Sequence, residues 1–163
     1  MDERVDRGER GGRKAILNLV YMETKFAPEL KVKVVAPALD FYKKAFGVVE
    51  LNRYSNDDGS IHIVELMLDG AEFYVHEQMP DSSGVSPEQA RGTTVELVVY
   101  SPDPDALVDR AVAAGARLMN PMQDHFYGLR QGSVLDPFGH LWTFQRRIEP
   151  TWSEIRGVNQ KAQ

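Results

Sequence analysis

The chain has no cysteine among its 163 residues, which excludes disulfides, thiolate metal ligands and a cysteine nucleophile. It also lacks an apolar run of about 18 residues, so the sequence predicts no membrane-spanning helix. Basic residues are not in excess: the net charge is -5 and the pI about 5.4, which argues against nucleic acid as the main partner. No Gly-rich phosphate loop, nucleophile elbow or HExxH motif is present. The remaining composition is that of an ordinary globular protein, and the lack of disulfides fits a cytoplasmic location.

What the chain does contain is an internal repeat. The segment Glu29–Val32 returns as Glu96–Val99 at an offset of 67 residues, and a stretch ending at Gly47 matches one ending at Gly115 at an offset of 68. This period is too long for a solenoid unit. It predicts a duplicated supersecondary module, in which equivalent positions of the two halves can be compared.

Each half is expected to form one strand, one helix and three further strands. Pro37 is expected at the first position of one helix, which ends at Gly47, and Asp103 is expected to cap a second helix that ends at Gly115. The strands are expected at Leu30–Val35, Val48–Tyr54, His62–Leu68 and Glu72–Glu77, and at Val95–Tyr100, Arg117–Met119, Gly132–Leu135 and Leu141–Arg146.

The composition divides the chain into five parts. Residues 1–14 alternate acids and arginines with glycines, which is typical of a disordered tail, and they lack the apolar region of a signal peptide. Residues 15–79 are interpreted as the first module with an N-terminal extension, 80–92 as a linker, 93–148 as the second module, and 149–163 as a C-terminal tail.

With the motifs ALDFYKKAFG and VLDPFGHLWTF in its two halves, the chain resembles the vicinal oxygen chelate superfamily, which includes glyoxalase I, bleomycin-resistance proteins and extradiol dioxygenases. The stretch AVAAGARLMNPMQDHFYGLRQGSVLDPFGHLWTF resembles its PhnB-like branch. The resemblance spans about residues 26–148. It implies an α+β fold in which two βαβββ modules curl their mixed sheets into a cup-shaped cleft, and a homodimer, as in many relatives. It does not specify a reaction, because the superfamily includes lyases, dioxygenases and drug-binding proteins.

The resemblance also implies where a metal would bind. Metal-dependent members place one ligand near the start of each module's first strand and one in its last strand, and the matching positions are Glu29, Tyr74, Glu96 and Thr143. This quartet has two carboxylates but no imidazole, and a phenol and an aliphatic hydroxyl are poor ligands for a divalent ion at neutral pH. We therefore expect no metal and no other cofactor, with a divalent metal as the alternative.

Four residues of the expected cleft carry polar chemistry. Glu96 lies within an apolar strand, so it either binds a cationic ligand group or acts as a general base, or else faces solvent or bonds Arg130 or nearby backbone. The same two readings apply to Glu29: a carboxylate that acts in the cleft, or one that faces solvent or forms a structural bond. Tyr74 and His76 share a strand face. The phenol could bind a ligand, whereas the imidazole is either an acid–base group or simply exposed near the strand end.

The segment 124–130 is expected to be an aromatic loop over the cleft mouth. Its Phe126, Tyr127 and Arg130 suit a planar or anionic small molecule, although Phe126 could instead close the core and Arg130 form a salt bridge. Trp142 and Phe144 point away from Thr143 and are expected in the core.

The sequence therefore predicts a metal-independent protein that binds an aromatic or amphipathic small molecule, for example to sequester a toxic compound. Its expected partners are that ligand and a second copy of the chain, with neither nucleic acid nor membrane. Two alternatives are an enzyme and a scaffold without a ligand. The enzyme would be a metal-dependent lyase or dioxygenase, or an isomerase that uses Glu96 as its base.

Overall fold

The computed structural model describes residues 24–80 and 84–148. The predicted tails at 1–14 and 149–163, and the first part of the N-terminal extension, lie outside the described residues. The first half contains β1 (Glu29–Val32), α1 (Val35–Phe46), β2 (Val49–Ser55), β3 (Ile61–Leu68) and β4 (Ala71–Glu77). After the one-turn α2 (Pro87–Ala90), the second half contains β5 (Glu96–Tyr100), α3 (Pro104–Ala113), β6 (Arg117–His125), β7 (Leu129–Leu135) and β8 (Leu141–Arg147). The predicted α+β fold with two βαβββ modules is confirmed.

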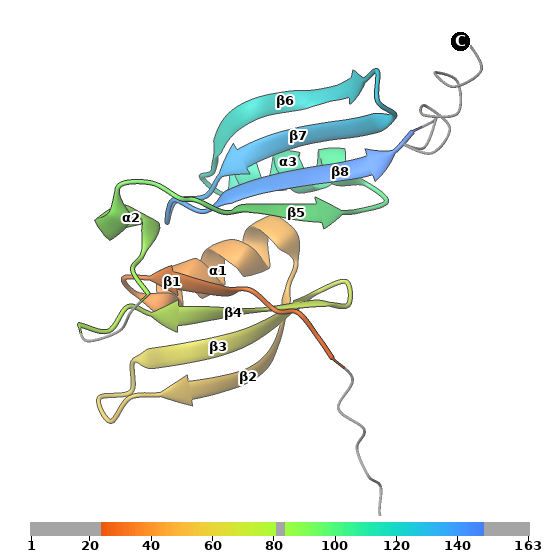
Figure 1. The fold of residues 1–163 in the computed structure, drawn as a ribbon. Coiled ribbons are helices and arrows are strands. Elements are labelled where there is room, and N and C mark those ends of the chain that lie inside the picture. Colours follow the sequence, from red (N-terminus) through yellow and green to blue (C-terminus); the bar gives the residue numbers. More distant parts are fainter. Residues whose placement is uncertain (1–23, 81–83, 149–163) are drawn as a thin grey trace, which may run out of the picture.

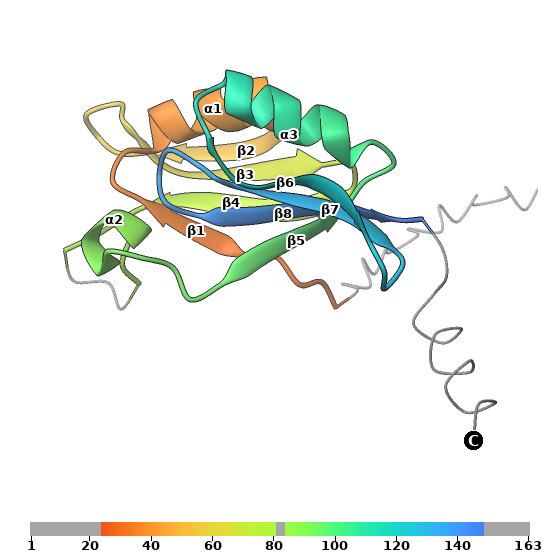
Figure 2. The same cartoon turned by 90° about the horizontal axis from the view of Figure 1, so that it is seen from above.

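Each module forms its own four-stranded mixed sheet, ordered β1-β4-β3-β2 in the first and β5-β8-β7-β6 in the second. The first strand of each module runs parallel to the last, and the remaining pairs are antiparallel. The two sheets lie beside each other and do not close (Figure 1). Both long helices cover the same side of them (Figure 2). Each sheet therefore has a helix-covered face and a helix-free face.

The helix ends follow the sequence signals, with one shift. In α3, the side chain of Asp103 accepts a hydrogen bond from the Ala106 N–H at 3.1 Å, as expected of an N-cap. Helix α1 begins at Val35, so that Pro37 is its third residue and not its first. This start is compatible with proline because the first N–H groups of a helix have no intrahelical partner. Gly47 ends α1 at a φ of 69°, a left-handed conformation that glycine adopts without strain.

Two segments differ from the prediction. Residues 124–130 do not form a loop, because β6 extends to His125 and β7 begins at Leu129, which leaves a tight hairpin turn. Sequence patterning missed these extensions because two register shifts in the β6–β7 pair interrupt the strand alternation. The linker contains the short helix α2, which is capped by the Ser86 side chain.

One hydrophobic core joins the two modules. Phe46, from the last turn of α1, lies with its ring centroid 4.9 Å from that of Trp142 and 5.0 Å from that of Phe144, both on β8. All three side chains are buried, so the prediction that the β8 aromatics belong to the core is confirmed. Because α1 packs against α3 and its Phe46 ring reaches the β8 aromatics, the two modules share one hydrophobic core.

A buried carboxylate stabilises the same junction. Asp136, in the turn before β8, accepts hydrogen bonds from Tyr42 Oη at 2.6 Å and Trp142 Nε1 at 3.0 Å, and from the backbone N–H groups of Phe138 and His140 at 2.9 Å. Burial, followed by the charge of Asp136, raises the pKa of Tyr42 well above its ordinary value. None of the described helices is long and apolar enough to cross a membrane.

Candidate functional site

The helix-free face of the first sheet carries three of the predicted site residues. Glu29 lies opposite Tyr74 in the β1–β4 pair, and the next residues on this face are Lys31 and His76, which also lie opposite each other. The Tyr74 hydroxyl donates to Glu65 Oε1 on β3 at 3.0 Å. This bond to a carboxylate raises the pKa of Tyr74. The structure thus places a phenol and two carboxylates on one surface.

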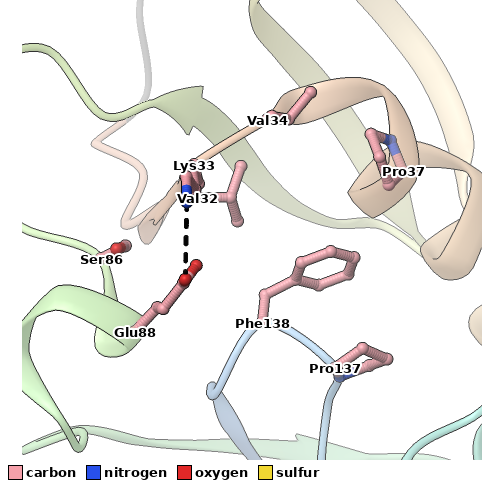
Figure 3. Close-up of a pocket in the computed structure, with 8 residues that line it drawn as sticks. All are labelled: Val32, Lys33, Val34, Pro37, Ser86, Glu88, Pro137 and Phe138. Atoms are coloured by element: carbon pink, nitrogen blue, oxygen red, sulfur yellow. Dashed lines mark ion pairs between the residues drawn. The ribbon is translucent and has the colours of Figure 1, made fainter.

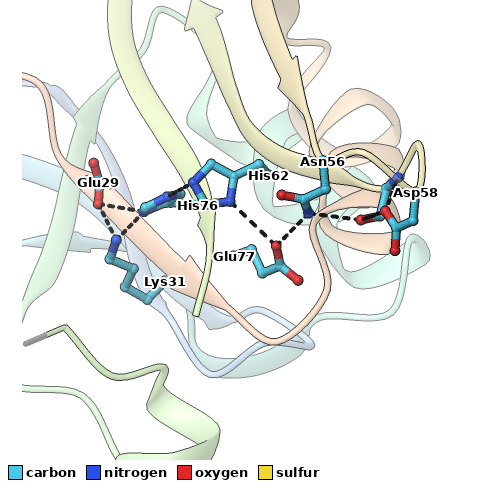
Figure 4. Close-up of polar contacts among 8 residues, drawn as sticks. Glu29, Lys31, Asn56, Asp58, His62, His76 and Glu77 are labelled. Atoms are coloured by element: carbon cyan, nitrogen blue, oxygen red, sulfur yellow. Dashed lines mark hydrogen bonds and ion pairs between the residues drawn. The ribbon is translucent and has the colours of Figure 1, made fainter. Parts of the chain in front are cut away.

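Glu29 is neither free nor bonded to Arg130. Its Oε1 lies 2.5 Å from Lys31 Nζ and 3.1 Å from His76 Nδ1. The hydrogen bond from Lys31, more than its charge and the contact with His76, lowers the pKa of the Glu29 carboxyl. His76 is also not the exposed strand-end residue of the simpler prediction, because its side chain is only 17% exposed and contacts Lys31, Glu29 and His62 (Figure 4).

The helix-free face of the second sheet carries Glu96 and Thr143. The Thr143 hydroxyl donates to Glu96 Oε1. Because Trp142 and Phe144 point into the core, Thr143 must point to the opposite face. Glu96 is exposed, whereas Thr143 is 3% exposed. The pair therefore presents a carboxylate at the surface, oriented by a buried hydroxyl.

Sequence reasoning missed two further polar residues on this face. Ser133 on β7 lies opposite Thr143, and Gln145 follows Thr143 on β8, and both are buried. Strand alternation already places Gln145 on the same face as Thr143, and Ser133 lies within the predicted strand 132–135, but its position opposite Thr143 depends on how β7 and β8 pair. Val98 and Tyr100 flank this polar strip as exposed side chains of β5. The second face thus combines neutral polar groups with exposed apolar ones.

The residues of the predicted aromatic loop do not gather on this face. Arg130 points to the helix side, where its guanidinium contacts Asp105 at 2.5 and 2.8 Å and Asp124 at 2.8 Å. A salt bridge was the predicted alternative to a ligand-binding role for Arg130. Phe126 does not close the core, since it is 92% exposed in the hairpin turn. Tyr127 stacks on His125 with ring centroids 4.7 Å apart.

The four positions that match the ligands of metal-dependent relatives lie as two pairs on different sheets. Glu29 pairs in register with Tyr74 on the first sheet, and Glu96 bonds Thr143 on the second. Across the described ranges, no group of three or more His, Asp or Glu side chains is arranged to hold a metal ion. The donor set is also unfavourable, because a neutral phenol and a threonine hydroxyl bind divalent ions weakly. The residues present do not fit a metal centre.

Two hollows lie near these faces. A groove of about 590 Å³ runs between β5 and the β3–β4 turn, and its walls include Glu96, Glu72 and Trp142. A smaller pocket of about 280 Å³ lies where the start of α1, α2 and the turn before β8 meet (Figure 3). It contains none of the predicted site residues, and Lys33 and Glu88 form an ion pair of 3.7 Å at its edge. Of the predicted site residues, Glu96 therefore borders the larger of these two hollows.

Comparison with known proteins gives consistent results. An uncharacterized protein of Mycobacterium tuberculosis is 35% identical over 143 residues, which cover 85% of this chain and 84% of that protein. The crystal structure of TioX from Micromonospora sp. ML1 is 30% identical, covers 78% of this chain and 99% of its own, and superposes with a TM-score of 0.60. An Arabidopsis thaliana gene product of known structure is 31% identical, with 75% of this chain and 98% of that chain covered and a TM-score of 0.59.

The match to a family model agrees with these relatives and with the two βαβββ modules. The matching region is residues 27–144, which includes the first module, the linker and the second module as far as the middle of β8. The chain belongs to the Glyoxalase/Bleomycin resistance protein/Dioxygenase superfamily.

Proposed function

We propose that this protein binds a small aromatic or amphipathic molecule that carries a cationic group, without a metal or other cofactor. The observation that carries the proposal is a pair of carboxylates on the helix-free faces. Glu65 accepts from the Tyr74 hydroxyl at 3.0 Å, and Glu96 accepts from that of Thr143. Within the described part of the chain, neither carboxylate forms an ion pair. A ligand cation would supply the missing opposite charge, and nearby aromatic and apolar side chains would contact its body.

The proposal includes a homodimer in which two chains complete the cup. The two modules of one chain already pack together through their helix-covered faces, so the helix-free faces remain available. Each of these faces exposes large apolar side chains, such as Tyr54 on the first and Val98 and Tyr100 on the second. Joining the first face of one copy to the second face of another would cover this apolar surface. It would also bring Glu29 and Tyr74 towards Glu96 and Thr143.

The dimer is tested by light scattering after size exclusion. Val98→Lys places a charge in the proposed interface and should give a monomer. Val112→Lys places the same charge on an exposed position of α3, outside the interface, and should remain a dimer. A monomeric parent protein, or two variants that behave alike, would refute this assembly.

Ligand binding is tested by a thermal-shift screen of cationic, neutral and anionic aromatic compounds on untagged protein. A ligand at about 100 times its dissociation constant adds roughly 2.7 kcal/mol of stability, which is readily measured. Glu96→Gln should weaken the cationic hits, whereas Glu88→Gln on α2 should not. A screen in which no compound stabilises the protein would favour a scaffold without a ligand.

The alternative is an enzyme of the same superfamily, acting as a lyase, isomerase or dioxygenase. The position of Glu96 at the border of the 590 Å³ groove favours it as the general base. Turnover that requires added Ni, Zn, Mn or Fe(II), or that is lost in Glu96→Gln while binding persists, would support an enzyme over a binding protein. We further propose that the chain belongs to the PhnB-like branch and acts in the cytoplasm.

A further inference from the structure

One buried carboxamide on the helix-free face of the second sheet has no hydrogen-bond partner. Gln145 on β8 is only 6% exposed, and within the described part of the chain its side chain forms no hydrogen bond. A carboxamide has two N–H donors and an accepting oxygen, and buried polar groups are normally bonded. Burying this group without a partner lowers stability, so packing alone does not account for a glutamine at this position.

The amide head of Gln145 reaches the surface although the rest of the side chain is buried. Among the described residues, His62 Nδ1 is the one buried side-chain atom that is both inaccessible and without a partner. The nitrogen and oxygen of the Gln145 amide, which also have no partner, must therefore be accessible. Strand alternation directs them to the same face as Thr143, away from the aromatic core. The buried stem thus holds the amide in place and presents it to the helix-free face.

A second carboxamide lies directly opposite the first. Gln131 on β7 is opposite Gln145 in the β7–β8 pair, and Cβ atoms of opposite residues are about 4.5–5.5 Å apart. The Tyr127 hydroxyl donates to Gln131 Oε1 at 3.2 Å, and Asn120 Nδ2 donates to Ser133 Oγ at 2.6 Å. No described residue accepts from the Gln131 N–H2 group or from the Ser133 hydroxyl. Both groups therefore remain available as donors beside Gln145.

The two glutamines determine which ligand group would fit them. Together they offer two N–H2 donors and one free carbonyl acceptor, without a formal charge. Because a carbonyl oxygen has two lone pairs, one ligand carbonyl can accept from both N–H2 groups while a neighbouring ligand N–H donates to the Gln145 oxygen. Amides that keep an N–H, lactams and ureas have this arrangement. A carboxylate lacks the donor, and an ammonium group lacks the acceptor.

The charged residues on either side give the ligand a direction. Arg147 follows Gln145 on the same face, and its guanidinium carbon lies 5.8 Å from the centroid of the Tyr100 ring. A ligand cation would be repelled at this end, whereas the carboxylate of Glu96 near Thr143 would attract it. Thr143 and Gln145 are two residues apart on β8, which corresponds to about 7 Å at the rise of a strand.

We propose that Gln131 and Gln145 form a neutral subsite that binds an amide, lactam or urea group of the ligand, about 7 Å from the ligand's cationic group. This subsite rests on the proposed function and narrows its ligand class to cationic aromatic amides. Val98 lies opposite Thr143, and both Val98 and Tyr100 are exposed on β5 beside the subsite. These two side chains would contact the aromatic body between the two polar ends.

The test compares two compounds that differ in the amide alone, para-(aminomethyl)benzamide and para-methylbenzylamine, in ¹H–¹⁵N NMR titrations of the full chain. We expect the parent protein to bind the amide compound about tenfold more tightly. Gln145→Met removes the amide from a side chain of equal length and should abolish this preference, and Gln131→Met should reduce it. Gln89→Met is the matched control, because it removes an exposed amide on α2 and should keep the preference.

The outcomes separate this subsite from the cation site of the proposed function. Glu96→Gln should weaken both compounds equally, because both carry the ammonium group. Equal affinity of the parent protein for the two compounds, or a preference that persists in Gln145→Met, would overturn the amide subsite and leave the cation site intact. Binding of neither compound at millimolar concentration would overturn both.

Gln145→Met also has an effect that needs no ligand. The substitution keeps the buried stem and removes an amide that has no partner to lose, so the Tm of the unliganded variant should equal or exceed that of the parent protein. An amide bonded within the fold would give the opposite result. A clear fall in Tm, measured by calorimetry, would therefore overturn the proposal.

Discussion

Replacing Tyr42 by phenylalanine tests how the two modules are joined. The Tyr42 side chain is fully buried, and its hydroxyl donates to Asp136 Oδ2 at 2.6 Å. Phenylalanine keeps the ring and its aromatic contacts but removes the hydroxyl. The buried oxygen of Asp136 then retains only the bond from Trp142 Nε1 at 3.0 Å.

The magnitude follows from the kind of bond that is lost. A hydrogen bond to a charged group contributes about 1.5–3 kcal/mol, and a buried acceptor that loses a donor is at the upper end of such effects. Tyr42→Phe should therefore lower the free energy of unfolding by roughly 1.5–3 kcal/mol, or Tm by roughly 3–12 °C for a chain of this size. Urea unfolding followed by far-UV circular dichroism measures the change. Tyr54→Phe is the matched control, because that phenol is 62% exposed and should contribute less than about 0.5 kcal/mol.

The pH dependence gives a second, independent check. Burial and the charge of Asp136 raise the pKa of Tyr42, so the folded protein keeps the phenol protonated where the unfolded chain ionises it. Stability that depends on the neutral phenol is therefore complete below about pH 10 and is lost as the pH rises further. The difference between the parent protein and Tyr42→Phe should shrink above about pH 10. Equal stability of the two proteins at neutral pH, or an equal loss in Tyr54→Phe, would refute the reasoning.

Three further changes test other parts of the fold. Gly132→Ala places a Cβ 2.6 Å from a methionine sulfur and 3.0 Å from backbone, so calorimetry should show a loss of about 1–3 kcal/mol in the free energy of unfolding. Gly92→Ala is the control, because its Cβ would have nothing within 4 Å and its stability should be nearly unchanged. Phe46→Ala should remove about 3–5 kcal/mol in chemical denaturation, and both modules should still unfold in one transition because they share a core. Hydrogen bonds from Arg53 and then Lys43 lower the pKa of Glu50 to about 2. The parent protein should therefore be more stable than Glu50→Gln above about pH 4.5, and this difference should disappear as the pH falls through about 2. A Glu50→Gln difference that persists below about pH 2 would contradict that assignment.

The architecture could be predicted from the sequence because helix ends and strand faces are encoded by neighbouring residues. Asp103 before Pro104 and Gly47 after an apolar stripe mark helix ends through their own backbone chemistry. Strand alternation placed Trp142 and Phe144 in the core for the same reason. The β6–β7 hairpin was not predicted, since bulges break the alternation on which such a prediction depends.

The site was harder to predict because it depends on contacts between distant segments. Sequence spacing located Glu96 and Thr143 but not the hydrogen bond between them, and it could not indicate that Arg130 pairs with Asp105 on the other side of the sheet. His76 was the least predictable residue. Its partner His62 reaches it only through a bulge, and an insertion in register leaves no mark in a single sequence.

The two halves of the duplication have diverged in charge while keeping their geometry. The first sheet presents Glu29, Lys31 and two histidines on its helix-free face, whereas the second presents Thr143 and other neutral polar groups beside one carboxylate. A metal centre shared by both modules needs three or four good donors, and Tyr74 and Thr143 are poor ones. A cup assembled from two unlike faces would instead distinguish the two ends of its ligand, with the charged face meeting a polar end and the neutral face an uncharged one. Glu96→Gln and Lys31→Met should then alter affinity for different parts of the same molecule, and a compound series that varies one end at a time would show it.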